Sequence, residues 1–303
     1  MSEHKYYDIH FFEYFPVTNS SSLPTEFLLE SAINCFNFSS SIEKDIHTIK
    51  SINGCNSTLW GIKNEGNIFS IEYYFYFKKK YPQNSIENLI SIFSKYSNES
   101  LNPNYFDDNY FLISINPKED KIEGFNIYFP VVDLEYPIFK VDELGFIINA
   151  AKPIEISQFY SLKNQQTQDN NTYYGIRNLG EMSVLFNVFN KLHENLFPNE
   201  KIEYLYDVFK LPYLNLSNET RNVGVHLPSG IAQKLDCIGL YFTALDVNQF
   251  LGFLEHHNYS NEYIEKIKKN RSRLNHIRFD IGIDIQLKCN RLIIKKSSFY
   301  GTF

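Results

Sequence analysis

The feature that most constrains the fold of this chain is a pair of strand-like segments that recurs about five times, with helical segments between the pairs. Short polar turns separate the two strands of a pair, and the strands are rich in aromatic and β-branched residues. The predicted pairs are 58–64 with 68–77, 110–116 with 122–129, 154–163 with 172–177, 222–227 with 235–243, and 276–287 with 292–303. Apolar residues at helical spacing predict helices at 24–36, 42–50, 86–96, 133–151, 180–196, 202–209, 247–254 and 263–274.

Alternation divides the predicted strands into an apolar and a polar face. In the last pair, isoleucines at 277, 281, 283 and 285 alternate with Arg278, Asp280 and Asp284. Helices would cover the apolar face. The polar face would then meet solvent in an open or split sheet, or line the inside of a closed barrel.

Tyrosine is frequent on the polar face, and the chain holds 22 tyrosines and 27 phenylalanines. Repeated tyrosines favour a lined interior, and closure removes unpaired strand edges. We therefore predict an α+β fold, a closed antiparallel barrel of about ten strands built from five helix–strand–strand (αββ) units with the helices outside. The open sheet stays as the alternative.

An internal repeat supports a single domain over 1–303. The segment Gly61-Ile-Lys-Asn64 recurs as Gly175-Ile-Arg-Asn178, 114 residues later, and each follows an aromatic residue. The segment 110–129 aligns with 223–242 at an offset of 113. These matches predict two related parts, about 57–165 and 172–303.

Composition excludes several classes of protein. A net charge of −6 argues against a dedicated nucleic-acid binder, which normally carries a basic excess. Four scattered cysteines without a CxxC pair predict neither a zinc site nor a disulfide framework. The start of the chain is polar and no apolar run is long enough for a membrane span, so we expect a cytoplasmic protein.

Five αββ units in one domain of this length resemble the ABBA-type prenyltransferase barrel. The resemblance covers about 24–303 and is one of topology, because the family has no short diagnostic motif. It implies ten strands around a reaction chamber, inside which an isoprenoid group passes from an allylic diphosphate to an aromatic or peptide acceptor. The implied partners are these two substrates, Mg²⁺ can accompany the diphosphate, and no other cofactor or resident metal is implied.

The chemistry of such a chamber selects candidate residues on the polar face. Departure of a diphosphate is helped by cations placed where negative charge builds up. Arg278 is the first candidate, Lys63 and Arg177 share a position in the repeated motif, and Lys295 lies on the strand paired with that of Arg278. Solvated strand ends and a structural ion-pair ladder are the alternative interpretations of these charges.

Two further roles complete the predicted site. Aromatic rings can shield an allylic cation from water, and a carboxylate or histidine can take the proton that the acceptor loses. Glu72 and Asp280 are the predicted catalytic carboxylates, with Asp284 as a further candidate. The predicted shield and binding residues are Tyr74, Tyr76, Tyr128, Tyr241 and His226. Packing rings with satisfied hydroxyls are the alternative for the tyrosines.

Two other functions fit the same pattern. A non-catalytic barrel could hold a hydrophobic or aromatic small molecule, and two tandem ferredoxin-like modules could form a scaffold. Asp280-x-Gly-x-Asp284 lacks the remaining ligands of a calcium loop, so we predict no metal site there.

Overall fold

The chain is described by a computed structural model that gives the backbone of residues 21–38, 58–76, 87, 112–118, 121–130, 140–141, 147–148, 153–161, 166–175, 182–199, 210–214, 228, 230–289 and 291–302. Side chains are described at 21–38, 60–74, 87, 171, 189–199, 210–214, 228, 230–289 and 291–301. Statements below refer to these residues.

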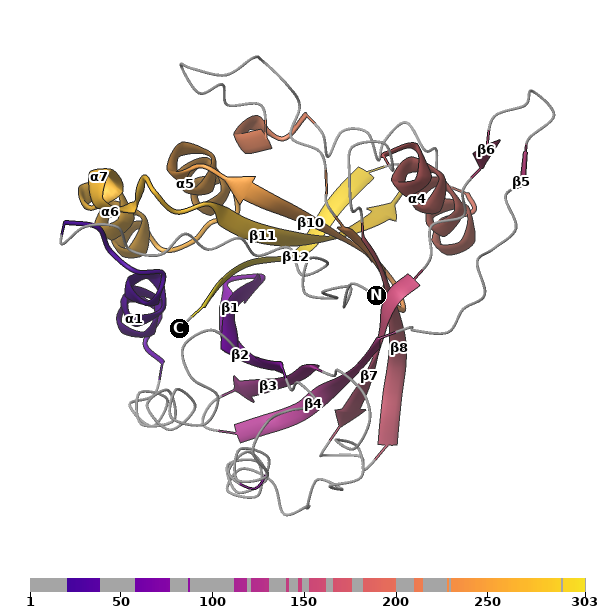
Figure 1. Cartoon of the computed structure of the whole chain (residues 1–303), viewed down its shortest axis with the longest axis horizontal. Helices are drawn as coiled ribbons and strands as arrows, with labels where there is room; N and C mark the ends of the chain where they lie inside the picture. Colours follow the sequence, from indigo (N-terminus) through magenta and orange to yellow (C-terminus); the bar gives the residue numbers. More distant parts are fainter. Residues whose placement is uncertain are drawn as a thin grey trace, which may run out of the picture.

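Ten of the described strands pair antiparallel in a ring, in the order β1-β12-β11-β10-β9-β8-β7-β4-β3-β2, with β2 returning to β1 (Figure 1). Their bounds are β1 (Thr58–Glu65), β2 (Ile68–Tyr76), β3 (Leu112–Lys118), β4 (Lys121–Pro130), β7 (Pro153–Ser161), β8 (Gln166–Gly175), β9 (Gly230–Gln233), β10 (Ile238–Leu245), β11 (Phe279–Lys288) and β12 (Arg291–Thr302). Helices lie outside this ring (Figure 1). The predicted mixed α+β architecture with an antiparallel sheet is thereby confirmed.

The described helices belong mainly to the C-terminal part of the chain. They are α1 (Glu26–Cys35), α4 (Met182–Leu196), α5 (Val247–His256), α6 (Asn261–Lys269), α7 (Arg271–Leu274) and the 3-10 turn η5 (Pro212–Leu214). Asp246 begins α5, because its carboxylate accepts from two backbone N–H groups while Gln249 bonds back to the Asp246 N–H. Ser260 begins α6 in the same way, accepting from the Tyr263 N–H.

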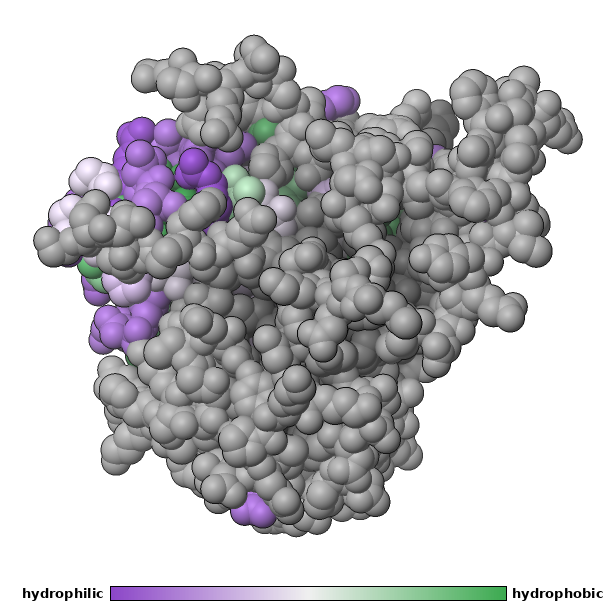
Figure 2. Space-filling model, in the orientation of Figure 1, coloured by the Kyte–Doolittle hydropathy of each residue, from purple (hydrophilic) through white to green (hydrophobic). Residues whose placement is uncertain are grey.

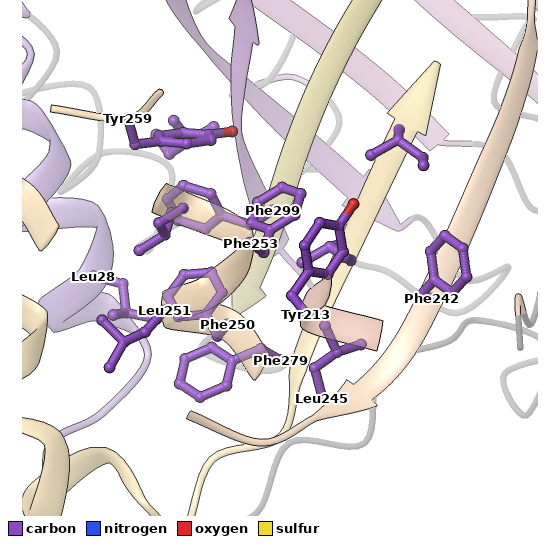
Figure 3. Close-up of a cluster of buried hydrophobic side chains, with 14 of the residues drawn as sticks. Leu28, Tyr213, Phe242, Leu245, Phe250, Leu251, Phe253, Tyr259, Phe279 and Phe299 are labelled. Carbon is purple, nitrogen blue, oxygen red and sulfur yellow. The ribbon is translucent and has the colours of Figure 1, made fainter. Parts of the chain in front are cut away.

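The outer face of the strands carries the hydrophobic core. Phe279 and Phe299 point outward from β11 and β12 and meet Phe250 of α5, which stacks on Phe279 at a ring-centroid distance of 4.2 Å (Figure 3). The ring of Tyr263 from α6 also stacks on Phe299, and its hydroxyl donates to the Leu28 carbonyl of α1. Burial of these rings is the main stabilising contribution to this side of the fold.

Two glycines make room for aromatic rings where β1 and β12 pair. In the β1–β12 ladder, Trp60 lies opposite Gly301 and Gly61 lies opposite Tyr300. A Cβ atom on Gly61 would come within 2.9 Å of the Tyr300 ring, and one on Gly301 would collide with the Trp60 ring. The two aromatic rings thus cover the two glycines reciprocally, Trp60 on the outer face and Tyr300 on the inner face.

Several predicted boundaries need correction. The turn of the fourth pair lies at 234–237, closed by a hydrogen bond from the Lys234 N–H to the Cys237 carbonyl, and not at 228–230. Segment 166–171, predicted as a loop because it is polar, belongs to β8, since strands on both sides supply backbone partners. The predicted helix at 263–274 is divided at Asn270, which caps both α6 and α7.

A predicted helix at 133–151 is also wrong where the backbone is described. Here Lys140–Val141 (β5) and Ile147–Ile148 (β6) pair as a small two-stranded sheet. The predicted segments 42–50, 202–209 and 222–227 lie outside the described residues, as does 86–96 apart from Glu87. The repeated glycines occupy different places, because Gly61 lies within the first strand of a hairpin and Gly175 ends the second strand of another. The two-part repeat stays a prediction.

Candidate active site

Polar side chains of five strands face the interior of the ring. Residues directly opposite in an antiparallel ladder share a face, and the ladder aligns Lys63 of β1, Ser298 of β12, Gly282 of β11 and Tyr241 of β10 in one row. A neighbouring row aligns Glu72, Gly61, Tyr300 and Asp280. The flanking residues on the same strands, such as Ile62, Ile71 and Phe299, belong to the outer core. Period-two alternation therefore separates the core from this inner cluster.

A buried carboxylate lies at one side of the inner cluster. Glu72 is only 1% exposed. One carboxylate oxygen is paired with the Lys63 ammonium, and the other accepts a hydrogen bond from the Tyr74 hydroxyl. Burial alone would raise the pKa of the Glu72 carboxyl, but the charge and hydrogen bond of Lys63 and the hydrogen bond of Tyr74 lower it below its usual value. Glu72 is therefore held as a carboxylate.

A second ion pair lies across the cluster. The Lys234 ammonium, carried inward by the β9–β10 turn, is 2.5 Å from Asp284 of β11 and 5.9 Å from the centre of the Tyr241 ring. Burial raises the pKa of Asp284, but the attraction and hydrogen bond of Lys234 and the charges of Lys296 and Lys63 bring the pKa below its usual value. The electrostatic interactions thus join both pairs into one cluster.

Tyrosine rings connect the two pairs. Tyr300 lies between Tyr74, at a centroid distance of 6.0 Å, and Tyr241, at 6.5 Å. Its hydroxyl is 2.8 Å from Ser298 Oγ, and burial raises its pKa well above the usual value. Room for these rings comes from glycine, because a Cβ on Gly282 would lie 3.1 Å from the Tyr241 ring.

A β-bulge divides two adjacent lysines at the rim, the end of the ring formed by the hairpin turns. The β11–β12 ladder shifts register between Asp284 and Ile285, which leaves an extra residue on β12. Lys296 pairs with Asp284 in the ladder and its ammonium is 3.1 Å from Glu65. Lys295 turns to the neighbouring hairpin, where its ammonium is 2.9 Å from the exposed carboxylate of Asp236.

The structure brings some of the predicted residues together. Of the predicted residues, Lys63, Glu72, Tyr74 and Tyr241 lie together on the inner face. Asp280 shares that face, but its carboxylate accepts a hydrogen bond of 3.1 Å from the Ala244 N–H, at a β10 irregularity where Ala244 has φ +60°.

Other predicted residues lie apart from the cluster. Arg278 precedes β11, and its guanidinium is 3.4 Å from the backbone carbonyls of Asn275 and Ile277. Lys295 lies at the rim. The side chains of Tyr76 and Tyr128, and all of Arg177 and His226, are outside the described parts of the chain.

Sequence reasoning missed Lys234, Lys296, Ser298 and Tyr300. Lys234 was missed because the turn was expected six residues earlier. Lys296, Ser298 and Tyr300 are every second residue of β12, so alternation counted back from Tyr300 could have placed all three on one face. This alternation ends at the bulge. Wherever side chains are described, no three His, Cys, Asp or Glu residues lie close enough together to hold a metal ion. No helix within the described ranges has the length and apolar composition needed to cross a membrane.

Comparisons with known proteins agree with the fold. No protein-family model matches the chain. A protein of Acanthamoeba polyphaga mimivirus, whose description names a JmjC domain, is 26% identical over 95% of this chain, which spans about half (48%) of that protein's length. Among solved structures, AnaPT from Neosartorya fischeri, an ABBA prenyltransferase, superimposes with a TM-score of 0.56 over 92% of this chain and 91% of its own, at 8% sequence identity. The likeness is one of fold, and the fold of this chain is that of the ABBA-type prenyltransferase barrel.

Proposed function

We propose that the ring of strands encloses a reaction chamber in which an isoprenoid group passes from an allylic diphosphate to an aromatic or peptide acceptor. The observation that carries the proposal is the inner cluster itself. It combines three lysines, three tyrosines and a fully buried carboxylate on the inner face of a prenyltransferase-type fold.

The lysines supply the positive charge for the donor. The charges of Lys234 and Lys296 both act on Lys63, and all three lysines act on Asp284, so we expect one diphosphate to contact all three ammonium groups. In the proposed step the carbon–oxygen bond of the allylic diphosphate breaks, and the diphosphate leaves with the electron pair. Ammonium groups and tyrosine hydroxyls at the departing oxygens lower the barrier to this step.

Tyrosine rings shield the allylic cation. Tyr74, Tyr241 and Tyr300 present ring faces and edges toward the same region, and Tyr300 is buried. The negative face of an aromatic ring attracts a cation, and the exclusion of water protects it from hydrolysis.

Glu72 accepts the proton that the acceptor loses. As the new bond from the acceptor to the allylic carbon forms, the acceptor carries a positive charge until a proton leaves. The hydrogen bond from Tyr74 and the charge of Lys63 hold Glu72 as a carboxylate, so it can take this proton and later pass it to water.

The test is a transfer assay with matched variants. Purified protein would be incubated with dimethylallyl or geranyl diphosphate and a panel of indoles, phenols and Trp- or Tyr-containing peptides, with prenylated product detected by mass spectrometry. We expect Lys234→Met to lower turnover about a hundredfold, whereas Lys268→Met, on the exposed side of α6, leaves it unchanged. Failure of every diphosphate to bind or react would contradict the proposal.

One specific observation favours a second function, a barrel that binds a small molecule without catalysing a reaction. Each of the three inner lysines already has a carboxylate partner, as a structural ion-pair ladder would. A barrel that only holds a small molecule would bind an aromatic ligand in the same assay without forming a transfer product, and Lys234→Met would leave that binding unchanged.

A further inference from the structure

The described part of the inner cluster carries no excess of positive charge. Lys63 is paired with Glu72, and Lys234 with Asp284. Lys296 contacts Glu65 at the rim. Asp280 adds a further buried carboxylate on the same face. A diphosphate ligand with about three negative charges would therefore enter a region where each of these three cations is already neutralised.

The opposite side of the ring adds few cations in its sequence. Strands β7 and β8 contain no Lys or Arg. Strands β3 and β4 contain only Lys118 and Lys121, at the ends that meet in their turn. Within the described strands and turns of the ring, the cations closest to the inner carboxylates are therefore the paired lysines of β1, β12 and the β9–β10 turn.

The two partners of each pair differ in their freedom to respond. Glu72 of β2 and Asp284 of β11 have shorter side chains than lysine and are 1% and 8% exposed. Lysine has a long, flexible side chain with three donors. An arriving phosphate oxygen would thus draw the ammonium toward itself, while the carboxylate would stay in place with less of its compensating charge.

A buried carboxylate that loses its cation and gains a neighbouring anion binds a proton more tightly. We propose that an allylic diphosphate binds by taking the lysines from their carboxylates, and that Asp284 takes up a proton from solvent as it binds, while Glu72, which keeps its hydrogen bond from Tyr74, stays a carboxylate. This inference rests on the proposed function, since it concerns the donor site. It makes donor binding stronger at lower pH, within the range where the protein stays folded.

The groups around Glu72 and Asp284 decide which of the two carboxylates takes up a proton when the lysines bind phosphate. Glu72 faces Lys63, Tyr74 and Lys296, and its charge also acts on Tyr300.

Asp284 faces Lys234, Lys296 and Lys63, and its charge also acts on the Cys237 thiol and the Tyr300 hydroxyl. Among these described neighbours the lysines are the only cations. Once they bind phosphate, none of these described neighbours supplies Asp284 with a cation or a hydrogen bond, whereas the Tyr74 hydroxyl still donates to Glu72.

Calorimetry measures the proton uptake directly. The full-length protein would be titrated at pH 7.5 with the unreactive thiolodiphosphate analogue of dimethylallyl diphosphate, in buffers of different ionisation enthalpy. The slope of observed enthalpy against buffer enthalpy counts the protons taken up, and we expect about half a proton or more per ligand. The ligand's own titration is common to all variants, so differences between variants report on the protein.

Matched variants show which carboxylate takes up the proton. Asp284→Asn should reduce the uptake and tighten binding about tenfold, because one competing charge is removed. Glu72→Gln also removes a competing charge and should tighten binding, but it should leave the proton uptake unchanged. The control is Asp236→Asn, which removes an equivalent Asp–Lys pair from the exposed rim, and it should change neither quantity.

Each outcome decides a different question. Binding without proton uptake, or binding that needs Mg²⁺ and takes up no protons, would overturn this inference and leave the proposed function standing. No binding in any variant would overturn the proposed function and the inference with it. The buffer series on the unaltered chain keeps the inference falsifiable even where a variant does not fold.

Discussion

Two aspartate–lysine pairs connect the β9–β10 hairpin to the β11–β12 hairpin, and they have the same chemistry in different surroundings. Lys234 and Asp236 are two residues apart in the β9–β10 turn, yet Lys234 points inward to Asp284 and Asp236 points outward to Lys295. The Asp284 side chain is 10% exposed and that of Asp236 is 51% exposed. Both carboxylates have pKa values below the usual one.

The difference shows that burial, and not pairing alone, decides how strongly a charged side chain depends on its partner. At the rim, water and salt screen the pair, and its net contribution to stability is small. On the inner face, each charge depends on its partner because little water replaces that partner. The inner charges are therefore the ones that a ligand can redistribute.

The largest effect is expected at the most buried pair. Lys63→Met would leave the Glu72 carboxylate without its cation, which should lower the free energy of unfolding by about 3–5 kcal/mol. Urea denaturation followed by circular dichroism measures the change. The double variant Lys63→Met/Glu72→Gln should recover much of the loss, and no recovery would show that the Lys63 side chain acts through packing.

A smaller effect is expected at the partly exposed inner pair. Lys234→Met should lower the free energy of unfolding by about 1–3 kcal/mol, because the Lys234 side chain is 20% exposed and water can partly replace it near Asp284. The same denaturation experiment measures it. A loss as large as that of Lys63→Met would mean that Asp284 is less hydrated than its exposure indicates.

Acid should weaken the inner ion pairs and so lower the free energy of unfolding. Because the folded-state pKa values of Glu72 and Asp284 are lowered, both residues stabilise the fold above their unfolded-state pKa values, near pH 4. That contribution is lost as the pH falls through the folded-state values. Unfolding free energies measured from pH 7 to pH 2 should therefore fall less steeply in Asp284→Asn than in the unaltered protein.

The smallest effect is expected at the rim. Lys295→Met should change the free energy of unfolding by no more than about 1 kcal/mol. Raising the salt concentration to about 0.5 M should remove most of that difference, because the pair is solvent-exposed. An effect equal to that of Lys234→Met would break the distinction between rim and interior.

The faces of the strands could be predicted from the sequence because alternation is a local property. Glu72 and Tyr74 on β2, and Tyr241 on β10, follow the pattern and face inward as predicted. Burial of the intervening apolar side chains under α1, α5 and α6 fixes that choice of face.

Register and turns could not be predicted in the same way. The bulge leaves Lys295 as the extra residue of β12 while Lys296 lies opposite Asp284, and the position of a bulge depends on the partner strand. Lys234 enters the cluster through a turn whose position depends on backbone pairing between β9 and β10. Arg278 has the correct parity, but the strand begins one residue later, at Phe279.

The basic side of the helices offers a useful contrast to the interior. The last turns of α6 and α7 contain Lys266, Lys268, Lys269 and Arg271. The surface over this part of the molecule is hydrophilic (Figure 2). These residues are more numerous than the inner lysines and more accessible to an anion. A diphosphate that simply sought positive charge would bind there.

A crystal structure with the thiolodiphosphate analogue of dimethylallyl diphosphate tests the central claim most directly. We predict that the diphosphate lies inside the ring, with oxygens bonded to Lys63, Lys234 and Lys296 and the prenyl chain against Tyr74, Tyr241 or Tyr300. A diphosphate bound at the α6–α7 surface, with the inner lysines still paired to Glu72 and Asp284, would contradict the account.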